Sequence, residues 1–251
     1  MWGRRLFGPL RSSFAQGEAR LGRLAMGGSN SPQVVYTVNS HYSGKINVWK
    51  KGGSLVLEVG GYPQSVSVNT PDLSQRYWYK AVEAVSHNLI ALNPRGRGIR
   101  VLVIGVGGGT ILHLLSRNFP EIKIVGVEID EEIIKIARQF FELDKISNLE
   151  VVMGDGGEYV PAYQGEPFGL VFVDAYLGGN FPLHFEEENF LQQLWRIAHP
   201  KGVVAINRTG GFDPRKFREL LGRVFAKVEM VRIPLPGFLG GMGGNSLYLC
   251  K

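Results

Sequence analysis

Residues 101–110 read VLVIGVGGGT, an apolar run that ends in four closely spaced glycines and a threonine. This pattern is typical of a buried strand that turns sharply into a helix, because glycine adopts backbone conformations that other residues rarely reach. Arg100–Ile104 is therefore a predicted strand, and four later segments have the same character: Lys123–Glu128, Glu150–Met153, Gly169–Val173 and Gly202–Asn207. Helical periodicity separates them, in Thr110–Asn118, Glu131–Phe141 and Glu187–Ala198. Strands that alternate with helices predict an α/β fold with a doubly wound, mainly parallel sheet.

The two ends of the chain add strands of a different kind. After a last predicted helix at Pro214–Phe225, the segments Lys227–Ile233 and Ser246–Cys250 predict an antiparallel pair at the C-terminal edge of the sheet. Upstream, segments of alternating polarity flank Lys51-Gly52-Gly53, a hairpin signature that predicts a small antiparallel N-terminal β-sheet. We expect this small sheet within residues 31–74 and a larger domain over residues 75–251 that begins with a helix at 75–92.

The first 30 residues differ in composition from the rest. They carry five arginines against one glutamate, whereas the other 221 residues carry 23 basic and 21 acidic side chains. A nucleic-acid partner would require a basic face on the folded body, so the net charge of +6 does not favour one, although an RNA-binding arm stays open. We expect residues 1–30 to be a basic flexible arm, or the result of a misassigned start, rather than an organelle-targeting presequence.

Composition limits the remaining classes of protein and site. The chain has no uninterrupted apolar run of about 18 residues, so we expect no membrane span and a cytoplasmic protein. Cys250 is the only cysteine, which excludes a disulfide within the chain and a metal site built from cysteines. The five histidines have no ligand-like spacing, and we expect no metal.

Glycines and acids follow the predicted strands at the edge where such sheets bind ligands. In chain order they are Gly105, Gly107, Gly108, Gly109, Glu128, Asp155, Gly156 and Asp174. Each has an ordinary structural explanation when taken alone, such as a tight turn or a helix cap. Their succession at four strand ends predicts a crevice for a nucleoside, in which Glu128 accepts hydrogen bonds from ribose hydroxyls.

The motif order identifies the kind of nucleoside. A dinucleotide-binding GxGxxG motif and a GK[ST] phosphate loop are both missing. The order GxGxG, Glu, GDG, Asp resembles the class I S-adenosylmethionine-dependent transferases. Residues 40–208 resemble the spermidine synthase-like (polyamine aminopropyltransferase) family, through VLVIGVGGGT, VGVEIDEEIIKIARQFF, MGDGGEYV and LVFVDAY.

This resemblance implies a Rossmann-like class I methyltransferase fold and roles for three acids. It implies that Glu128 holds the ribose hydroxyls, that Asp155 holds the adenine amino group and that Asp174 meets the attacking amine. Asp174 is thus the candidate catalytic residue, although a structural aspartate that stabilises the next turn is the alternative. The resemblance also implies that the N-terminal sheet covers the site or pairs subunits, so a homodimer is possible.

Departures from the family pattern concern the substrate. Aminopropyltransferases of this family carry an acid where this chain has Gly108, and their tyrosine–histidine–glutamate stretch is replaced near Tyr79. An acid at position 108 would pair with the ammonium of decarboxylated S-adenosylmethionine and repel the carboxylate of intact S-adenosylmethionine. Gly108 removes this repulsion and leaves backbone N–H groups at a helix N-terminus to meet the carboxylate. It therefore favours methyl transfer to a small-molecule amine or a protein lysine. Aminopropyl transfer and a non-catalytic nucleoside-binding role are the alternatives.

Three further residues are candidates for the acceptor pocket. Tyr79 and Tyr176 could attract a cationic amine to their rings, although packing explains a tyrosine equally well. Gln64 could bond to the substrate or simply end a strand.

Overall fold

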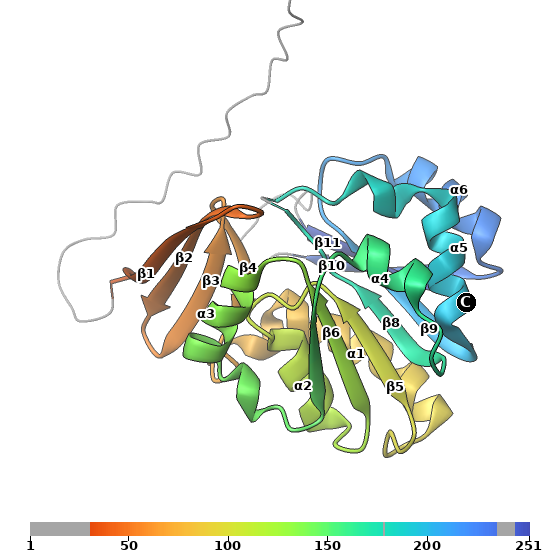
Figure 1. The fold of residues 1–251 in the computed structure, drawn as a ribbon, viewed down its shortest axis with the longest axis horizontal. Helices are drawn as coiled ribbons and strands as arrows, with labels where there is room; N and C mark the ends of the chain where they lie inside the picture. Colours follow the sequence, from red (N-terminus) through yellow and green to blue (C-terminus); the bar gives the residue numbers. More distant parts are fainter. Residues whose placement is uncertain (1–30, 178, 235–243) are drawn as a thin grey trace, which may run out of the picture.

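Seven strands form the large sheet of the computed structural model, which describes residues 31–177, 179–234 and 244–251. The predicted arm at residues 1–30 lies outside the described residues. The strands are β5 (Arg100–Ile104), β6 (Lys123–Glu128), β7 (Leu149–Met153), β8 (Phe168–Val173), β9 (Ala198–Arg208), β10 (Val228–Pro234) and β11 (Gly244–Cys250). Their order across the sheet is β10-β11-β9-β8-β5-β6-β7 (Figure 1).

Strand directions confirm the predicted sheet. The pairs among β5, β6, β7, β8 and β9 are parallel, whereas β11 runs antiparallel to both β9 and β10. Strand β5 pairs with β6 on one side and with β8 on the other, so the chain order reverses beside β5. In open α/β sheets, ligands bind at this reversal, outside the carboxyl ends of the strands.

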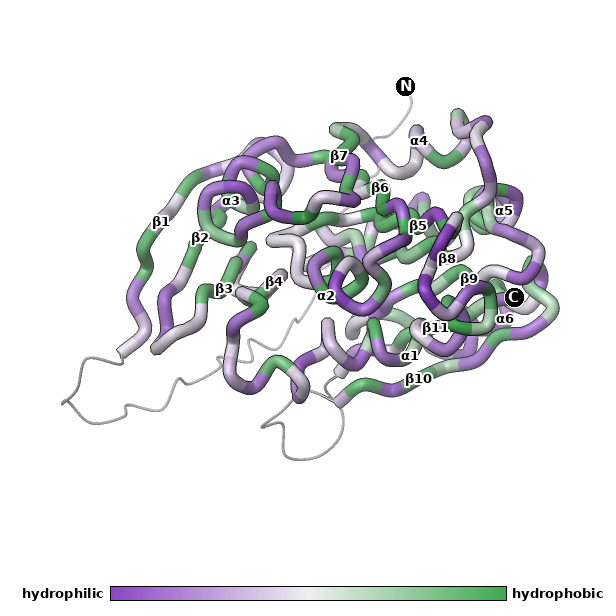
Figure 2. The backbone as a smooth tube through the Cα atoms, turned by 90° about the horizontal axis from the view of Figure 1, so that it is seen from below, coloured by the Kyte–Doolittle hydropathy of each residue, from purple (hydrophilic) through white to green (hydrophobic). Residues whose placement is uncertain are grey.

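Helices cover both faces of the sheet. The helices α1 (Tyr77–Leu92), α2 (Thr110–Asn118) and α3 (Glu131–Phe141) pack on one face, with β5 residues such as Val101 and Val103. The helices α4 (Gly156–Ala162), α5 (Glu188–Ile197) and α6 (Pro214–Val224) pack on the other, with Leu102 and Ile104. Because successive strand residues point to opposite faces, a strand buried on both sides is apolar throughout, as β8 is. Figure 2 shows the hydropathy of each segment along the chain.

The sequence did not predict α4. Its segment was interpreted as a glycine turn, because Gly156, Gly157 and Pro161 are poor helix formers. The side chain of Asp155 accepts a hydrogen bond from the Gly157 N–H at 2.8 Å and so caps this short helix. Several other predicted boundaries differ by one or two residues, and the largest difference is in β9, which begins at Ala198 rather than at Gly202.

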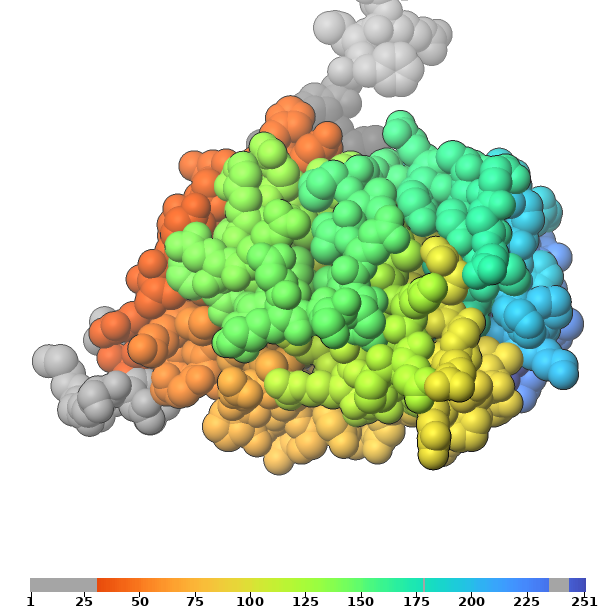
Figure 3. All heavy atoms as spheres, turned by 60° about the horizontal axis from the view of Figure 1, so that its bottom comes forward, coloured from red at the N-terminus to blue at the C-terminus, as the bar shows by residue number. Residues whose placement is uncertain are grey.

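The small sheet precedes the large domain. It contains β1 (Gln33–Ser40), β2 (Gly44–Lys51), β3 (Ser54–Val59) and β4 (Tyr62–Val66), all antiparallel to their neighbours. One of its faces packs on α3, where a shared core includes Ile46, Leu57 and Phe141. In the space-filling view the N-terminal strands abut the α3 segment in one continuous surface (Figure 3). This packing holds β4 beside the end of β5.

No helix among the described residues is long and apolar enough to cross a membrane.

Candidate nucleoside site

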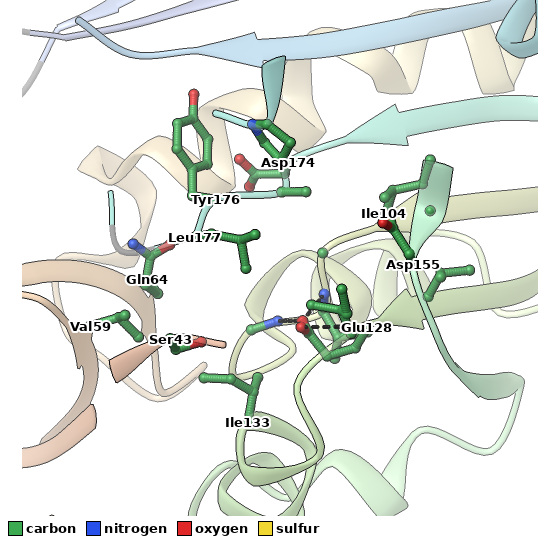
Figure 4. A pocket seen from close by; sticks show the side chains of 18 of the residues that line it. Ser43, Val59, Gln64, Ile104, Glu128, Ile133, Asp155, Asp174, Tyr176 and Leu177 are labelled. Atoms are coloured by element: carbon green, nitrogen blue, oxygen red, sulfur yellow. Dashed lines mark hydrogen bonds between the residues drawn. The ribbon is translucent and has the colours of Figure 1, made fainter. Parts of the chain in front are cut away.

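A cavity lies at the carboxyl ends of β5, β6, β7 and β8, facing the small sheet. It encloses about 850 Å³ of empty space, its open mouth included. Ser43, Val59 and Gln64 enter it from the N-terminal strands and their turns, opposite Glu128, Asp155 and Asp174 from the large sheet (Figure 4). The structure thus brings together the three acids that the sequence selected.

The glycine turn after β5 forms the floor of the cavity. Gly105 has a φ of 93°, and a Cβ there would lie 2.4 Å from the backbone oxygen of Asp174. Gly107 and Gly109 also have positive φ, at 53° and 83°. Only glycine meets both demands at position 105 without strain. Gly105 and Gly107 line the cavity, so the backbone there is open to a ligand.

Gly108 differs from the other glycines of the turn, and our interpretation of it needs correction. It is not among the lining residues; its N–H donates to Ser65 Oγ at 2.7 Å, and a Cβ there would lie 2.8 Å from Ser65 Cβ. Thr110, two residues later, exchanges two hydrogen bonds with the Val66 backbone, which fixes β4 against the turn. The Gly108 N–H is therefore not available to a cofactor carboxylate, and the position has no room for an acidic side chain.

Glu128 is held by backbone amides at the end of β6. Its Oε2 accepts hydrogen bonds from Val106 N and Gly107 N at 3.0 and 3.3 Å, and its Oε1 accepts from Ile129 N and Asp130 N at 3.0 and 3.1 Å. Burial raises the pKa of Glu128, and these hydrogen bonds oppose the rise. Glu128 also lines the cavity, so these hydrogen bonds fix a carboxylate that faces a ligand there.

Asp155 and Gly156 form the opposite end of the cavity. Asp155 Oδ1 caps α4 and lies 3.7 Å from His184 Nε2, so the structural and the cavity-lining roles coexist in one side chain. Gly156 also lines the cavity, and a Cβ there would lie 2.4 Å from Ile104 Cγ2. Any larger residue at 156 would displace the side chain at the end of β5.

Asp174 has the most perturbed carboxyl group of the site. Burial raises its pKa to about 6, against a hydrogen bond of 2.6 Å from Asn207 Nδ2. The Tyr77 hydroxyl is buried beside this carboxylate, and burial together with the charge of Asp174 raises the pKa of Tyr77. Asn245 donates in turn to Asn207 Oδ1 at 3.0 Å. Asn207, itself held by Asn245, thus fixes the Asp174 carboxylate where it lines the cavity.

Two of the three residues predicted for the acceptor pocket line the cavity, and the third does not. Tyr176 lines the cavity next to Asp174, and its hydroxyl donates to Asn207 O at 3.1 Å and accepts from Thr209 N at 2.9 Å. Gln64 lines the cavity from β4. Tyr79 is not among the lining residues and is 37% exposed, whereas its neighbour Trp78 does line the cavity. Successive helix residues point about 100° apart, so the inward position of Trp78 turns Tyr79 outward.

Comparison with known proteins decides the family. Residues 96–230, more than half of the chain, match the family model described as a methyltransferase domain. The chain belongs to the methyltransferase domain family.

Relatives of this methyltransferase domain fall into two groups. The chain is 29% identical over 142 residues to a polyamine aminopropyltransferase of Chromobacterium violaceum, a match that covers 56% of the chain and 53% of that protein. It is 31% identical over 120 residues to the human eEF1A lysine and N-terminal methyltransferase, covering 43% of the chain and 17% of that protein. The chain thus spans about half the length, or less, of these relatives.

Solved structures agree on the fold. The crystal structure of a probable spermidine synthase from Corynebacterium glutamicum superposes with a TM-score of 0.72 at 19% identity, covering 87% of this chain and 80% of that one. Together with the family match and the relatives, this gives the chain a spermidine synthase-like class I methyltransferase fold and a transferase domain of the S-adenosylmethionine type.

The methyltransferase cavity is acidic. Among its described lining residues the ionisable groups are three carboxylates, Tyr176 and His184, without lysine or arginine. Such a lining favours positively charged ligand groups. The part of the chain that the structure describes holds no group of three or more His, Cys, Asp or Glu side chains placed to bind a metal ion.

Sequence reasoning missed several lining residues. Ser43, Ser65, Trp78, Pro182, His184 and Phe185 all contribute to the cavity. Trp78 stands at helical spacing with apolar residues of α1, and this spacing marks the inward face of the helix without distinguishing core from cavity. No comparable signal identifies His184, because the segment between β8 and α5 lacks periodicity.

Proposed function

We propose that the chain transfers an alkyl group from a sulfonium nucleoside to an amine, and that this group is methyl. The cavity suits a nucleoside because Gly105 and Gly107 leave space that a Cβ would fill, while Glu128 and Asp155 lie at separate strand ends. S-adenosylmethionine, when bound, would supply an electrophilic carbon next to a positively charged sulfur.

Our preference for methyl over aminopropyl transfer rests on the residues that surround Gly108. A side chain at 108 would collide with Ser65 Cβ and would lie 3.1 Å from the Phe141 ring, so this turn cannot present an acid to an ammonium group. Ser65, which accepts the hydrogen bond from the Gly108 N–H, is neutral, and so are the lining residues Ser43 and Gln64 from the small sheet. Neutral donors tolerate the zwitterionic end of intact S-adenosylmethionine better than a carboxylate would.

Asp174 would orient the acceptor. An attacking amine must be neutral, with its lone pair aimed at the carbon, and the fixed carboxylate can accept a hydrogen bond from one of its N–H groups. With a pKa of about 6, Asp174 is ionised at pH 7.5 and is a stronger base than an ordinary aspartate. Transfer breaks the carbon–sulfur bond, forms a carbon–nitrogen bond and releases the proton of the amine. The acceptor would be a small-molecule amine or a protein lysine.

Calorimetric titration with S-adenosylmethionine and with its decarboxylated form tests this proposal. We expect tighter binding of the intact cofactor. Tighter binding of the decarboxylated form would instead support aminopropyl transfer, and binding of neither would support a protein without this activity.

A further inference from the structure

The segment from Phe181 to Glu186 covers one end of the cavity. Its inner residues Pro182, His184 and Phe185 line the cavity, and His184 Nε2 lies 3.7 Å from Asp155 Oδ1. The Phe185 ring stacks on Phe190 of α5, with centroids 4.5 Å apart and an interplanar angle of 8°. This end is the one at which Asp155 and Gly156 would meet the base of a nucleoside.

Both ends of this segment contact one arginine at the end of β9. Arg208 Nη1 donates to Glu186 Oε1 at 2.6 Å, and its Cζ lies 4.2 Å from the centroid of the Phe181 ring. Phe212 and Phe217 enclose the guanidinium further, at 4.4 and 4.8 Å. The residues that line the cavity thus lie between two contacts with the same side chain.

This arrangement is costly for the fold. The Arg208 side chain is 4% exposed, and its Nε is buried without a hydrogen-bond partner among the described residues. Burying a charge costs several kcal/mol before its contacts compensate, and an apolar residue fills such a position at lower cost. The simplest explanation for a buried charge at Arg208 is that the charge has a role beyond packing. Its ion-pair partner is Glu186.

Arg208 also adjoins the acceptor end of the site. The preceding residue, Asn207, donates to Asp174 and accepts from Tyr176 through its backbone oxygen. The end of β9 therefore fixes the acceptor acid with one residue and the covering segment with the next.

We propose, on the basis of the proposed function, that Arg208 is a positioning residue that clamps Phe181–Glu186 over the nucleoside end of the cavity. The clamp keeps His184 and Phe185 in place as a wall, so that a bound nucleoside leaves slowly. The contact with Glu186 supplies the charge pairing, and the contact with Phe181 fixes the other end of the segment.

The test compares Glu186→Gln with Glu188→Gln. Glu188 lies two residues away and faces the exposed Arg223 at 3.6 Å, outside the cavity, so its variant is a matched control. We expect the affinity for S-adenosylhomocysteine to fall about tenfold in Glu186→Gln, a loss of about 1.4 kcal/mol, and to stay at the wild-type value in Glu188→Gln. Arg208→Lys, which keeps the charge without the planar stacking, should lie between wild type and Glu186→Gln.

Hydrogen exchange of the ligand-free proteins provides a readout that is independent of the cofactor. Glu186→Gln should speed exchange in residues 182–187 and leave β8 unchanged, whereas a merely structural ion pair would lower thermal stability without this local change. Unchanged exchange in 182–187 would overturn the clamp, even if affinity falls. If wild-type protein binds no S-adenosylhomocysteine, the proposed function fails, and exchange alone still decides on the clamp.

Discussion

Replacing Asp174 by asparagine should stabilise the fold while it removes the group that we propose to orient the acceptor. A rise of the Asp174 pKa from 3.8 to about 6 means that the folded protein holds this carboxylate at a cost. At neutral pH the rise corresponds to about 3 kcal/mol, because each tenfold change in proton affinity is worth about 1.4 kcal/mol. Because Asp174 lines the cavity, water there screens its charge and lowers the energetic cost of the carboxylate to about 2 kcal/mol. Asparagine has no charge to bury and can still accept the hydrogen bond from Asn207.

The sign of the pH dependence follows from the direction of the shift. Between about pH 4 and pH 6 the folded state binds more protons at Asp174 than the unfolded state, so the free energy of unfolding falls as pH rises through this window. Urea unfolding at pH 7.5 should therefore show Asp174→Asn to be more stable than wild type by about 2 kcal/mol. The difference should shrink toward zero near pH 4.

Asp213→Asn is the matched control. The Asp213 carboxylate caps α6, and hydrogen bonds from Arg215 N and Lys216 N hold its pKa below the usual range. Its replacement should lower stability at pH 7.5, in the opposite direction to Asp174→Asn. An Asp174→Asn protein that is less stable than wild type at pH 7.5, or equally more stable at pH 4 and 7.5, would refute the reasoning.

Three further substitutions test the glycine turn and the ribose contact. Gly105→Ala should cost about 3 kcal/mol in urea unfolding, because it combines a positive φ with a clash against backbone, whereas Gly53→Ala, with ordinary φ and open space, should be neutral. Gly108→Asp should lower stability by about 2 kcal/mol through overpacking against Ser65; unchanged stability together with tighter binding of decarboxylated S-adenosylmethionine would contradict our account of this position. Glu128→Gln should weaken S-adenosylhomocysteine binding in calorimetry roughly tenfold or more, since hydrogen bonds to a charged group are worth about 1.5–3 kcal/mol; wild-type affinity would exclude Glu128 from the site.

Much of the large domain could be predicted from the sequence, because its signals are local. The apolar run of β5 and the glycines after it determine a strand and a turn, and the predicted bounds of β5, β6, α2 and α3 match those observed. The position of the acids at strand ends then follows from the rule that parallel strands end at one edge.

The surroundings of Gly108 could not be predicted in the same way. Ser65 lies 43 residues earlier in the chain, and its hydrogen bond to the Gly108 N–H exists only because the small sheet packs on α3. The enclosure of Arg208 likewise depends on aromatic residues from separate loops and from α6. Contacts between distant segments carry no periodic signal, so charge reasoning about one position alone placed the Gly108 N–H wrongly.

The mass of the group that the proposed reaction adds to an amine tests the central claim most directly. Purified protein would be given intact and decarboxylated S-adenosylmethionine in equal amounts, together with polyamines and lysine-rich proteins, and the products analysed by mass spectrometry. The account predicts acceptors that carry one added methyl group, and no such product with Asp174→Asn. Acceptors that carry an aminopropyl group instead would contradict it.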